Sequence, residues 1–181
     1  VRPPGQHAGV KSGRGFSVFN NAAIAARYAQ RKLGIARVLL VNFSATPAIG
    51  AQEIFWRDPS VFVLSFHQQG RFGKAGSADW VGAGEGEGYH MNYPLPTTVQ
   101  EADVAKTFSK VFCAMAQHFA PGMLLFSCGF DLLEQDPLSE INLTEKAFSD
   151  VVRTAMRESR PFTGGKTVVL LEGGYTTAAV T

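Results

Sequence analysis

The chain has 181 residues, of which 45% are hydrophobic and 18% are charged, and its mean hydropathy is close to zero. This composition is typical of a globular protein with one sizeable core. The net charge is +2 and the basic residues are scattered along the sequence, which argues against a nucleic-acid-binding protein. No apolar run approaches the roughly 20 residues of a membrane span, and no signal peptide opens the chain.

The two cysteines and the ends of the chain suggest its setting. Cys113 and Cys128 lie in apolar segments, so we expect buried free thiols, which suit an intracellular protein. The chain begins at Val1 without a methionine and stops shortly after a glycine turn. We therefore expect a fragment of a longer domain.

Helical and extended patterns alternate along the chain. A first helix is expected over residues 21–33, ended by Gly34. Two more are expected over 101–119 and 144–159, where apolar residues recur with a period of 3.6 and Thr144 suits an N-cap. Four unbroken apolar runs predict strands buried on both faces, as in a parallel sheet. They are Val38–Val41, Val61–Leu64, Met123–Phe126 and Val168–Leu171. The expected fold class is α/β, with a three-layer, mostly parallel sheet and helices on both faces.

A long glycine-rich segment over residues 68–88 shows no period, which is typical of a functional loop or an irregular region. Its glycine run over 82–88 is not expected to bind phosphate. The run follows no predicted strand and opens no predicted helix, and it carries Glu85 and Glu87 where an anion would lie.

Candidate functional residues follow the predicted strands, since ligands of open α/β sheets bind beyond the carboxyl ends of the strands. His7 lies in a glycine-flanked loop and is a candidate for proton transfer, whereas the other histidines show no ligand spacing. Asp131 follows a buried strand and suits either a functional site or a turn. Tyr175 follows two glycines and suits either a ligand contact or a turn. Local sequence alone leaves these alternatives open.

A series of sequence blocks decides the family. In order they read RPPGQHA, GFSVFNNAAIAARYA, GAQEIF, DPSVFVLSFH, GEGEGYHMNYPLP, SCGFD, DPL, INLT and LEGGY. Together they resemble the catalytic domain of the histone deacetylases, closest to the class II type that carries RPPG before its histidines. The resemblance covers nearly the whole chain. It implies an arginase/deacetylase-like fold, so that residues 1–181 form a partial histone-deacetylase-like domain truncated at both ends.

The resemblance also implies a chemistry. Family members are zinc amidohydrolases that act on acetylated lysine. Two aspartates and one histidine hold the metal and leave a position for water and the acetyl carbonyl, as in other catalytic zinc sites. A histidine pair transfers protons, and a tyrosine at the edge of the site stabilises the oxyanion.

This chain departs from that pattern at most of the decisive positions. The strand before it and the block GAQEIF after it fix the alignment of residues 42–47 without gaps. Ser44 then stands for the first ligand aspartate and Thr46 for the ligand histidine, and neither hydroxyl is expected to bind zinc near neutral pH. The retained ligand position is Asp131. Gln6 replaces the first histidine of the proton-transfer pair, whereas His7 keeps the second and Tyr175 matches the family's tyrosine.

The surroundings of the site differ as well. Asn42 replaces the aspartate that would orient the first histidine, which predicts a neutral amide pair with Gln6. Ile49 replaces the group that would support the second histidine, and such outer partners contribute roughly 10- to 100-fold each to zinc affinity. Gln69 stands where an aromatic side chain usually grips the acyl-lysine stem, and residues 73–76 replace a proline-glycine loop.

Two functional hypotheses follow. The first is a catalytically inactive pseudo-deacetylase that serves as a binding or scaffold module, with no cofactor. The second is an active zinc-dependent lysine deacetylase that hydrolyses acetyl-lysine amides of proteins, with Cys128 as an alternative soft ligand. Both predict protein partners or protein substrates, a role linked to chromatin regulation and a nuclear or cytoplasmic location. A third expectation is that an uncovered sheet edge lets chains associate.

Overall fold

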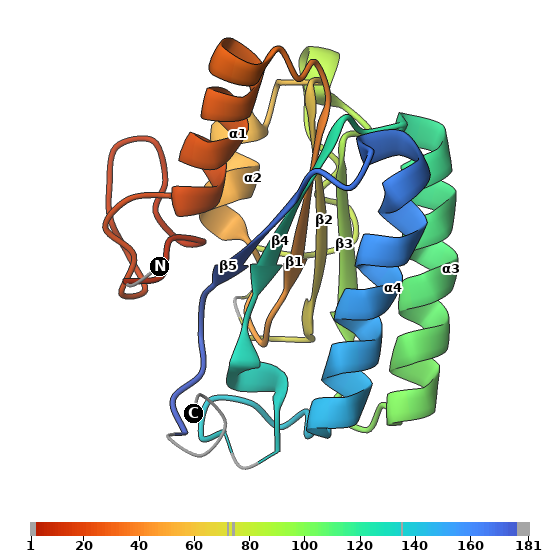
Figure 1. Ribbon diagram of the computed structural model, residues 1–181. Helices are drawn as coiled ribbons and strands as arrows, with labels where there is room; N and C mark the ends of the chain where they lie inside the picture. The colour runs from red at the N-terminus through yellow and green to blue at the C-terminus, as the bar shows by residue number, and fades with distance from the viewer. Residues whose placement is uncertain (1–2, 72, 74, 135, 177–181) are drawn as a thin grey trace.

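The computed structural model describes residues 3–71, 73, 75–134 and 136–176. Helices and strands alternate along the chain, and a short 3-10 helix precedes β3 and another follows β4 (Figure 1). The elements are α1 (Asn21–Leu33), β1 (Val38–Phe43), α2 (Ile49–Phe55), β2 (Val61–Gln68), η1 (Gly84–Gly86), β3 (His90–Leu95), α3 (Glu101–Phe119), β4 (Met123–Cys128), η2 (Phe130–Leu132), α4 (Glu145–Thr163) and β5 (Thr167–Leu171).

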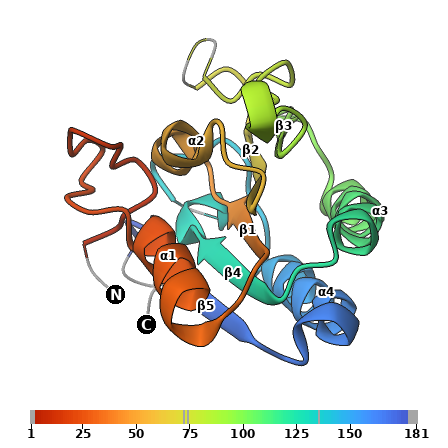
Figure 2. The ribbon, with the colours of Figure 1, turned by 90° about the horizontal axis from the view of Figure 1, so that it is seen from above.

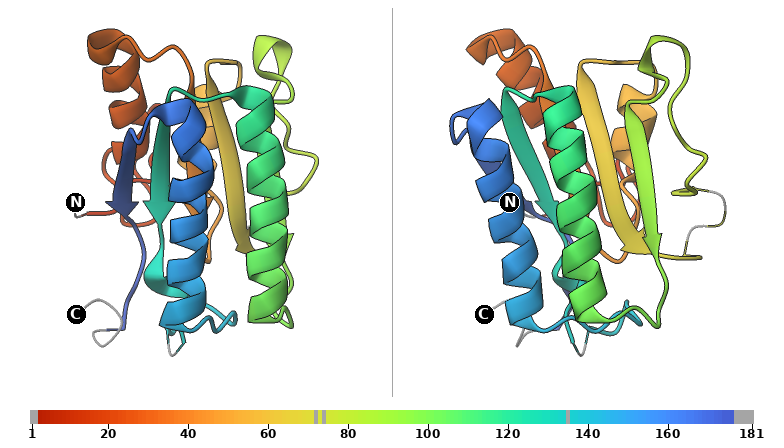
Figure 3. Two further views of the ribbon diagram at one scale, coloured as in Figure 1. Left: turned by 45° about the vertical axis from the view of Figure 1, so that its right-hand side comes forward. Right: turned by 90° about the vertical axis from the view of Figure 1, so that its right-hand side faces the viewer.

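The sheet has the strand order β3-β2-β1-β4-β5, and all of its neighbouring strands run parallel. Helices α1 and α2 cover one face, and α3 and α4 cover the other (Figures 2 and 3). The predicted three-layer α/β fold is therefore confirmed. Because all strands run the same way, their carboxyl ends meet at one edge of the sheet, and the loops that follow β1, β4 and β5 gather there (Figure 1).

Each face of the sheet has its own core. On the side of α3 and α4, large aromatic side chains fill the space, among them Phe43, Phe108 and Phe126, all with no exposed surface. On the other side, α1 packs through small alanines such as Ala26, so its backbone approaches the sheet closely. The central strands β1, β2 and β4 are buried at every position, as their unbroken apolar runs predicted.

The helix ends follow local chemistry. The Asn20 side chain accepts a hydrogen bond from the Ala23 N–H at the start of α1, which ends at Gly34 with φ 67°. Thr144 caps α4 in the same way. The prediction that this last helix ends at Ser159 is wrong, because α4 continues to Thr163 and includes Pro161. A proline in the last turn removes only one helical hydrogen bond, and Gly164 ends the helix in a left-handed conformation.

Two elements had no strong sequence signal. Helix α2 has only seven residues and no side-chain N-cap. Strand β3 is an edge strand that alternates between buried and exposed positions and contains Pro94, which an edge tolerates because it needs fewer hydrogen bonds. The loop predicted over residues 68–88 is confirmed for the described residues between 69 and 83, whereas Gln68 belongs to β2 and Gly84–Gly86 form η1.

Several smaller predictions can be compared with the structure. Cys113 and Cys128 are both free thiols, as expected, but only Cys128 is buried, whereas Cys113 is half-buried on α3. Among the described residues, no helix is long and apolar enough to cross a membrane. Strand β5 borders only β4 in the sheet, and its Val168 and Val169 are 40% and 48% exposed. The sequence did not specify which edge of the sheet would allow association between chains, and that association stays a prediction.

Candidate functional site

The candidate site lies beyond the carboxyl ends of β1 and β4, where the buried carboxyl group of Asp131 lies against the loop after β1. Its Oδ1 accepts a hydrogen bond from the Ala45 N–H at 2.9 Å, and Ser44 Oγ lies 3.0 Å from both carboxyl oxygens. Two glycines make room for this contact. A Cβ at Gly129 would lie 2.5 Å from Ser44 Oγ, and one at Gly173 would lie 2.6 Å from Asp131 Oδ2.

The environment of Asp131 is unfavourable for a charge. Burial raises the pKa of this carboxyl group to about 6, and the nearby Asp136 adds to the rise. The hydrogen bonds from Ala45 and Ser44 act in the opposite direction and limit the shift. Since these donors are an amide N–H and a neutral hydroxyl, the described part of the chain holds Asp131 by dipoles rather than by a counter-ion.

Gln6 and His7 extend this cluster from the amino-terminal loop. The Gln6 side-chain amide donates to Thr46 Oγ1 at 2.9 Å and to Ser44 Oγ at 3.2 Å. Thr46 Oγ1 also lies 3.1 Å from His7 Nε2. Burial, with a contribution from Arg14, lowers the pKa of His7 to about 4, so its ring is neutral near pH 7. A continuous set of polar contacts therefore runs from Asp131 through the two hydroxyls to a neutral histidine.

Asn42 does not form the expected amide pair with Gln6. Its amide donates instead to the Thr46 backbone carbonyl at 2.9 Å and to Ser65 Oγ at 3.0 Å. The NH₂ group of Gln6 donates to the hydroxyls of the loop after β1. The two amide side chains therefore direct their N–H groups to other partners and not to each other. Gln6 Oε1 and Asn42 Oδ1 are buried acceptors without a hydrogen-bond partner among the described residues.

Tyr175 lies at the rim of the site. Its side chain is 41% exposed, and its ring lies 6.1 Å from that of Phe16 in a tilted arrangement. Phe16 follows Gly15, at which a Cβ would lie 2.6 Å from the His7 ring. The adjacent residues Gly15 and Phe16 thus lie beside His7 and Tyr175, respectively. The Tyr175 backbone N–H donates to Asp136 Oδ2 at 2.7 Å, which fixes the backbone at this point of the rim.

Glu172 is a structural residue of the site that the sequence did not single out. Its carboxyl group is fully buried and accepts hydrogen bonds from the Gly5 and Gln6 backbone N–H groups at 2.7 and 3.1 Å. Its other oxygen accepts from Ser127 Oγ at 2.7 Å. Glu172 thus joins the amino-terminal loop to the ends of β4 and β5. The available signal was a carboxylate placed directly after the apolar run Val168–Leu171.

The residues present do not fit a catalytic zinc ion. Among the described residues, no three or more His, Cys, Asp or Glu side chains are grouped as a metal would require. The side chains next to Asp131 and Ser44 are the Thr46 hydroxyl and the Gln6 amide, and the His7 imidazole contacts Thr46 rather than Asp131, whereas zinc prefers thiolate, imidazole and carboxylate ligands. Cys128 does not remedy this. Burial, with the charges of Asp131 and Glu172, raises the pKa of its thiol to about 12, which disfavours the thiolate that a metal needs.

The other histidines have structural surroundings. His67 is buried, with Nδ1 at 3.0 Å from Ser65 Oγ and Nε2 at 2.9 Å from the Gly76 carbonyl. His90 Nε2 lies 3.0 Å from the Phe55 carbonyl, and His118 is exposed in the last turn of α3. Gln69 lines a surface hollow of about 340 Å³ beside His67, and its predicted role at the acyl-lysine stem stays a prediction. Lys74 of the loop over 73–76 lies outside the described residues.

Comparison with known proteins decides the ancestry of this arrangement. The family described as the histone deacetylase domain matches residues 1–181, the whole chain. The chain belongs to the histone deacetylase family. Histone deacetylase 14, chloroplastic, of Arabidopsis thaliana is 37% identical to this family member over 175 residues, which cover 97% of the chain and 41% of the relative.

Solved structures of the deacetylase fold agree. The crystal structure of the HDA15 HD domain superposes with a TM-score of 0.88 at 36% identity, over 99% of this chain and 51% of that one. An acetylpolyamine aminohydrolase from Burkholderia pseudomallei gives a TM-score of 0.87 at 35% identity, with the same shares covered. This deacetylase-family chain thus spans about half of each solved chain, and less of the curated relative.

Proposed function

We propose that this deacetylase-family domain does not hydrolyse acetyl-lysine and that it serves as a binding or scaffold module for other proteins. The observation that carries the proposal is the hydrogen-bonded cluster of Ser44, Thr46 and Asp131. By the family alignment these residues occupy the three metal-ligand positions, and Ser44 Oγ lies within 3.0 Å of both Asp131 oxygens.

The donor chemistry explains why zinc is not expected there. A catalytic zinc ion needs three protein ligands. Each is a carboxylate, a thiolate or a neutral imidazole, so each must be deprotonated when it binds the metal. Two of the three positions are hydroxyls, whose protons are used in hydrogen bonds to neighbouring side chains. The side-chain amide of Gln6 donates into the same space, so the hydroxyl oxygens of Ser44 and Thr46 accept hydrogen bonds from protein groups, although Gln6 Oε1 itself has no partner among the described residues. Three changed positions, Gln6, Ser44 and Thr46, are therefore mutually compatible.

The alternative function is that of an active zinc-dependent lysine deacetylase acting on acetylated proteins. It is favoured by Asp131, His7 and Tyr175, which by the resemblance keep the family's residues at their positions, and by the names of the relatives. Under this alternative the neutral His7 would accept a proton and Tyr175 would lie at the rim. The zinc ion would need ligands other than the hydroxyls of Ser44 and Thr46.

Zinc content and acetyl-lysine hydrolysis, measured on the same preparation, decide between the two. After dialysis against a weak chelator, the proposal predicts almost no zinc and no acetate release from an acetyl-lysine peptide. About one zinc per chain together with acetate release would establish the alternative.

A gain-of-binding variant makes the test sharper. The triple change Gln6→His, Ser44→Asp and Thr46→His restores the family's residues at the altered positions. If the hydroxyls are the reason that zinc does not bind, this variant should acquire stoichiometric zinc while the natural sequence does not. Circular dichroism checks that the variant is folded, and the single change Ser44→Asp serves as a partial restoration.

A nuclear or cytoplasmic location and a role in chromatin regulation remain part of this proposal. Two relatives, Histone deacetylase 14 of Arabidopsis thaliana and Histone deacetylase 10 of Oryza sativa, are named chloroplastic, so family membership alone does not fix the compartment. Fractionation of cells that express the complete protein would test this part.

A further inference from the structure

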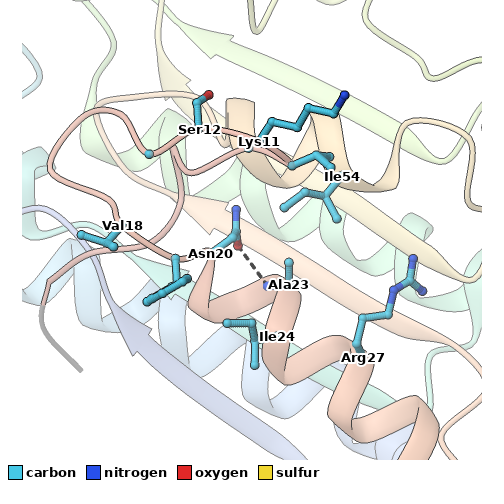
Figure 4. Close-up of a pocket in the computed structure, with 12 residues that line it drawn as sticks. Lys11, Ser12, Val18, Asn20, Ala23, Ile24, Arg27 and Ile54 are labelled. Atoms are coloured by element: carbon cyan, nitrogen blue, oxygen red, sulfur yellow. Dashed lines mark hydrogen bonds between the residues drawn. The ribbon is translucent and has the colours of Figure 1, made fainter.

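A second feature of the molecule lies on the outer side of α1 and uses none of the residues around Asp131. The loop before α1 and the first turns of that helix enclose a surface hollow of about 620 Å³ with α2 (Figure 4). Its lining is mostly apolar and includes Val10, Val18, Phe19, Ile24 and Ile54. Val10, Val18, Phe19 and Ile24 are each between 58% and 69% exposed, so the hollow presents apolar surface to solvent.

The apolar surface continues along the helix. Ile24 and Tyr28 are 58% and 59% exposed and lie one turn apart, on the same side of α1. Lys32 follows one turn later on the same line, with Arg31 and the exposed Leu33 beside it. Seven of the fifteen large apolar side chains that are exposed in the described part of the chain fall between Val10 and Leu33. Such a concentration marks an interaction surface more often than isolated exposed residues do.

The unpaired charges of this region are of one sign, because Glu53 and Asp58 beside the hollow are paired with Arg14 and Arg27. The first 52 residues contain seven Lys or Arg and no Asp or Glu, whereas the remaining 129 contain ten basic and fifteen acidic residues. Two of the seven find partners later in the chain, since Arg14 pairs with Glu53 and Arg27 with Asp58. In the described structure, Lys11, Arg31 and Lys32 have no ion pair.

Helix α4 shows the usual arrangement for a solvent-facing helix. Its exposed Lys146 pairs with Asp150, and its Arg157 pairs with Glu158. Helix α1 has basic residues, exposed apolar residues and no acidic ones, so neither its charges nor its apolar side chains are satisfied within the helix. A partner that supplies apolar side chains and carboxylates together would satisfy both.

We propose that the hollow and the outer face of α1 bind an acidic amphipathic helix of a partner protein. Apolar side chains of that helix enter the hollow and contact Ile24 and Tyr28, and its carboxylates face Lys11, Arg31 and Lys32. This is the helix-in-groove mode of recognition, with charge complementarity selecting the partner. A nucleic acid fits less well, because its phosphates would make no favourable contacts with the apolar side chains that make up most of the hollow. The inference goes beyond the proposed scaffold role and does not depend on the loss of zinc binding.

A fluorescent peptide of about 18 residues tests the inference, since α1 has 13 residues and such a helix spans its length. The probe carries leucine on one helical face and glutamate on the other. Two control peptides have the glutamates replaced by lysine, or the same composition in scrambled order. Binding is measured by fluorescence anisotropy on the 181-residue protein. We expect the acidic amphipathic probe to bind at least about tenfold more tightly than either control, and its affinity to fall with added salt.

Matched variants locate the site. Ile24→Ser with Tyr28→Ser, and separately Arg31→Glu with Lys32→Glu, should each weaken the probe by about tenfold. The control pair Lys106→Glu with Lys110→Glu changes exposed lysines on α3 and should leave the affinity within about twofold. All of these side chains are exposed or partly solvent-facing, so the fold should be retained, as circular dichroism can verify.

Several outcomes would overturn the inference. One is the absence of probe binding, and another is equal affinity for the lysine peptide or for the α1 variants. Displacement of the probe by duplex DNA would assign the face to nucleic acid instead. Sedimentation that shows a dimer of the natural sequence and a monomer of the Ile24→Ser, Tyr28→Ser variant would assign it to a second copy of the chain.

Discussion

Replacing Glu172 by alanine is expected to release the segment that carries Gln6 and His7 from the end of the sheet. The buried carboxyl group accepts hydrogen bonds from two backbone N–H groups and one hydroxyl. Each buried donor left without an acceptor costs about 1–3 kcal/mol. Because the freed loop can turn some of these donors toward water, we expect a total loss of about 3–5 kcal/mol of unfolding free energy, a large share of the stability of an ordinary domain.

Glu172→Gln is the matched control. Its carbonyl oxygen can accept from the Gly5 and Gln6 amides while its NH₂ faces Ser127, so it should cost about 1 kcal/mol. Urea unfolding followed by fluorescence of Trp56 and Trp80 gives the free energies, and hydrogen exchange of the Gly5 and Gln6 amides shows whether the loop is released. The reasoning is refuted if the alanine variant loses less than about 1 kcal/mol, or if glutamine and alanine are equally costly.

Three further predictions concern the interior. Burial lowers the pKa of His67 to about 4, so the natural protein should lose stability as the pH falls from about 6.5 toward 4. The variant His67→Gln should remove up to about 3 kcal/mol of that loss. If the difference in unfolding free energy between the two proteins, measured in urea, does not change with pH, this prediction is wrong. Gly50→Ala places a Cβ 2.2 Å from the Ala8 carbonyl oxygen and should destabilise by about 1–3 kcal/mol, seen as a lower thermal midpoint, because a backbone atom cannot move aside easily. Phe108→Ala removes a ring that contacts Phe43, Phe66 and Phe112, with an expected cost of about 3–5 kcal/mol in urea unfolding; a cost below about 1 kcal/mol would show that this core is loosely packed.

The strands could be predicted in position but not in length. Unbroken apolar runs predicted four of the five strands, yet β2 continues through Ser65, His67 and Gln68, which are all buried. These polar residues are stabilised by hydrogen bonds to partners such as Gly76 and Glu140, and their positions depend on the folded chain rather than on local hydrophobicity. A pattern of apolar residues therefore finds the middle of a buried strand and misses its polar end.

The candidate site was predictable in its residue types but not in its connections. The resemblance to the family predicts that Ser44, Thr46 and Asp131 occupy the ligand positions, which stays a prediction, and the structure brings these three residues into hydrogen-bond contact. The hydrogen bonds that the Asn42 amide donates could not be predicted from the sequence, since they depend on which acceptor oxygens lie next to it in the folded chain. The role of Glu172 was missed for a similar reason, because its partners Gly5 and Gln6 lie more than 160 positions away in the sequence.

That separation also has a consequence for the order of folding. During synthesis the loop with Gln6 and His7 leaves the ribosome long before Glu172, so its hydrogen bonds to Glu172 cannot form until the end of β5 is in place. Contacts between such distant residues are slow to form, because the entropy of closing a long chain must be overcome first. We therefore expect the sheet and its helices to assemble first and the site to be completed last. Slow late protection of the Gly5 and Gln6 amides, in pulsed hydrogen exchange during refolding, would record this sequence of events.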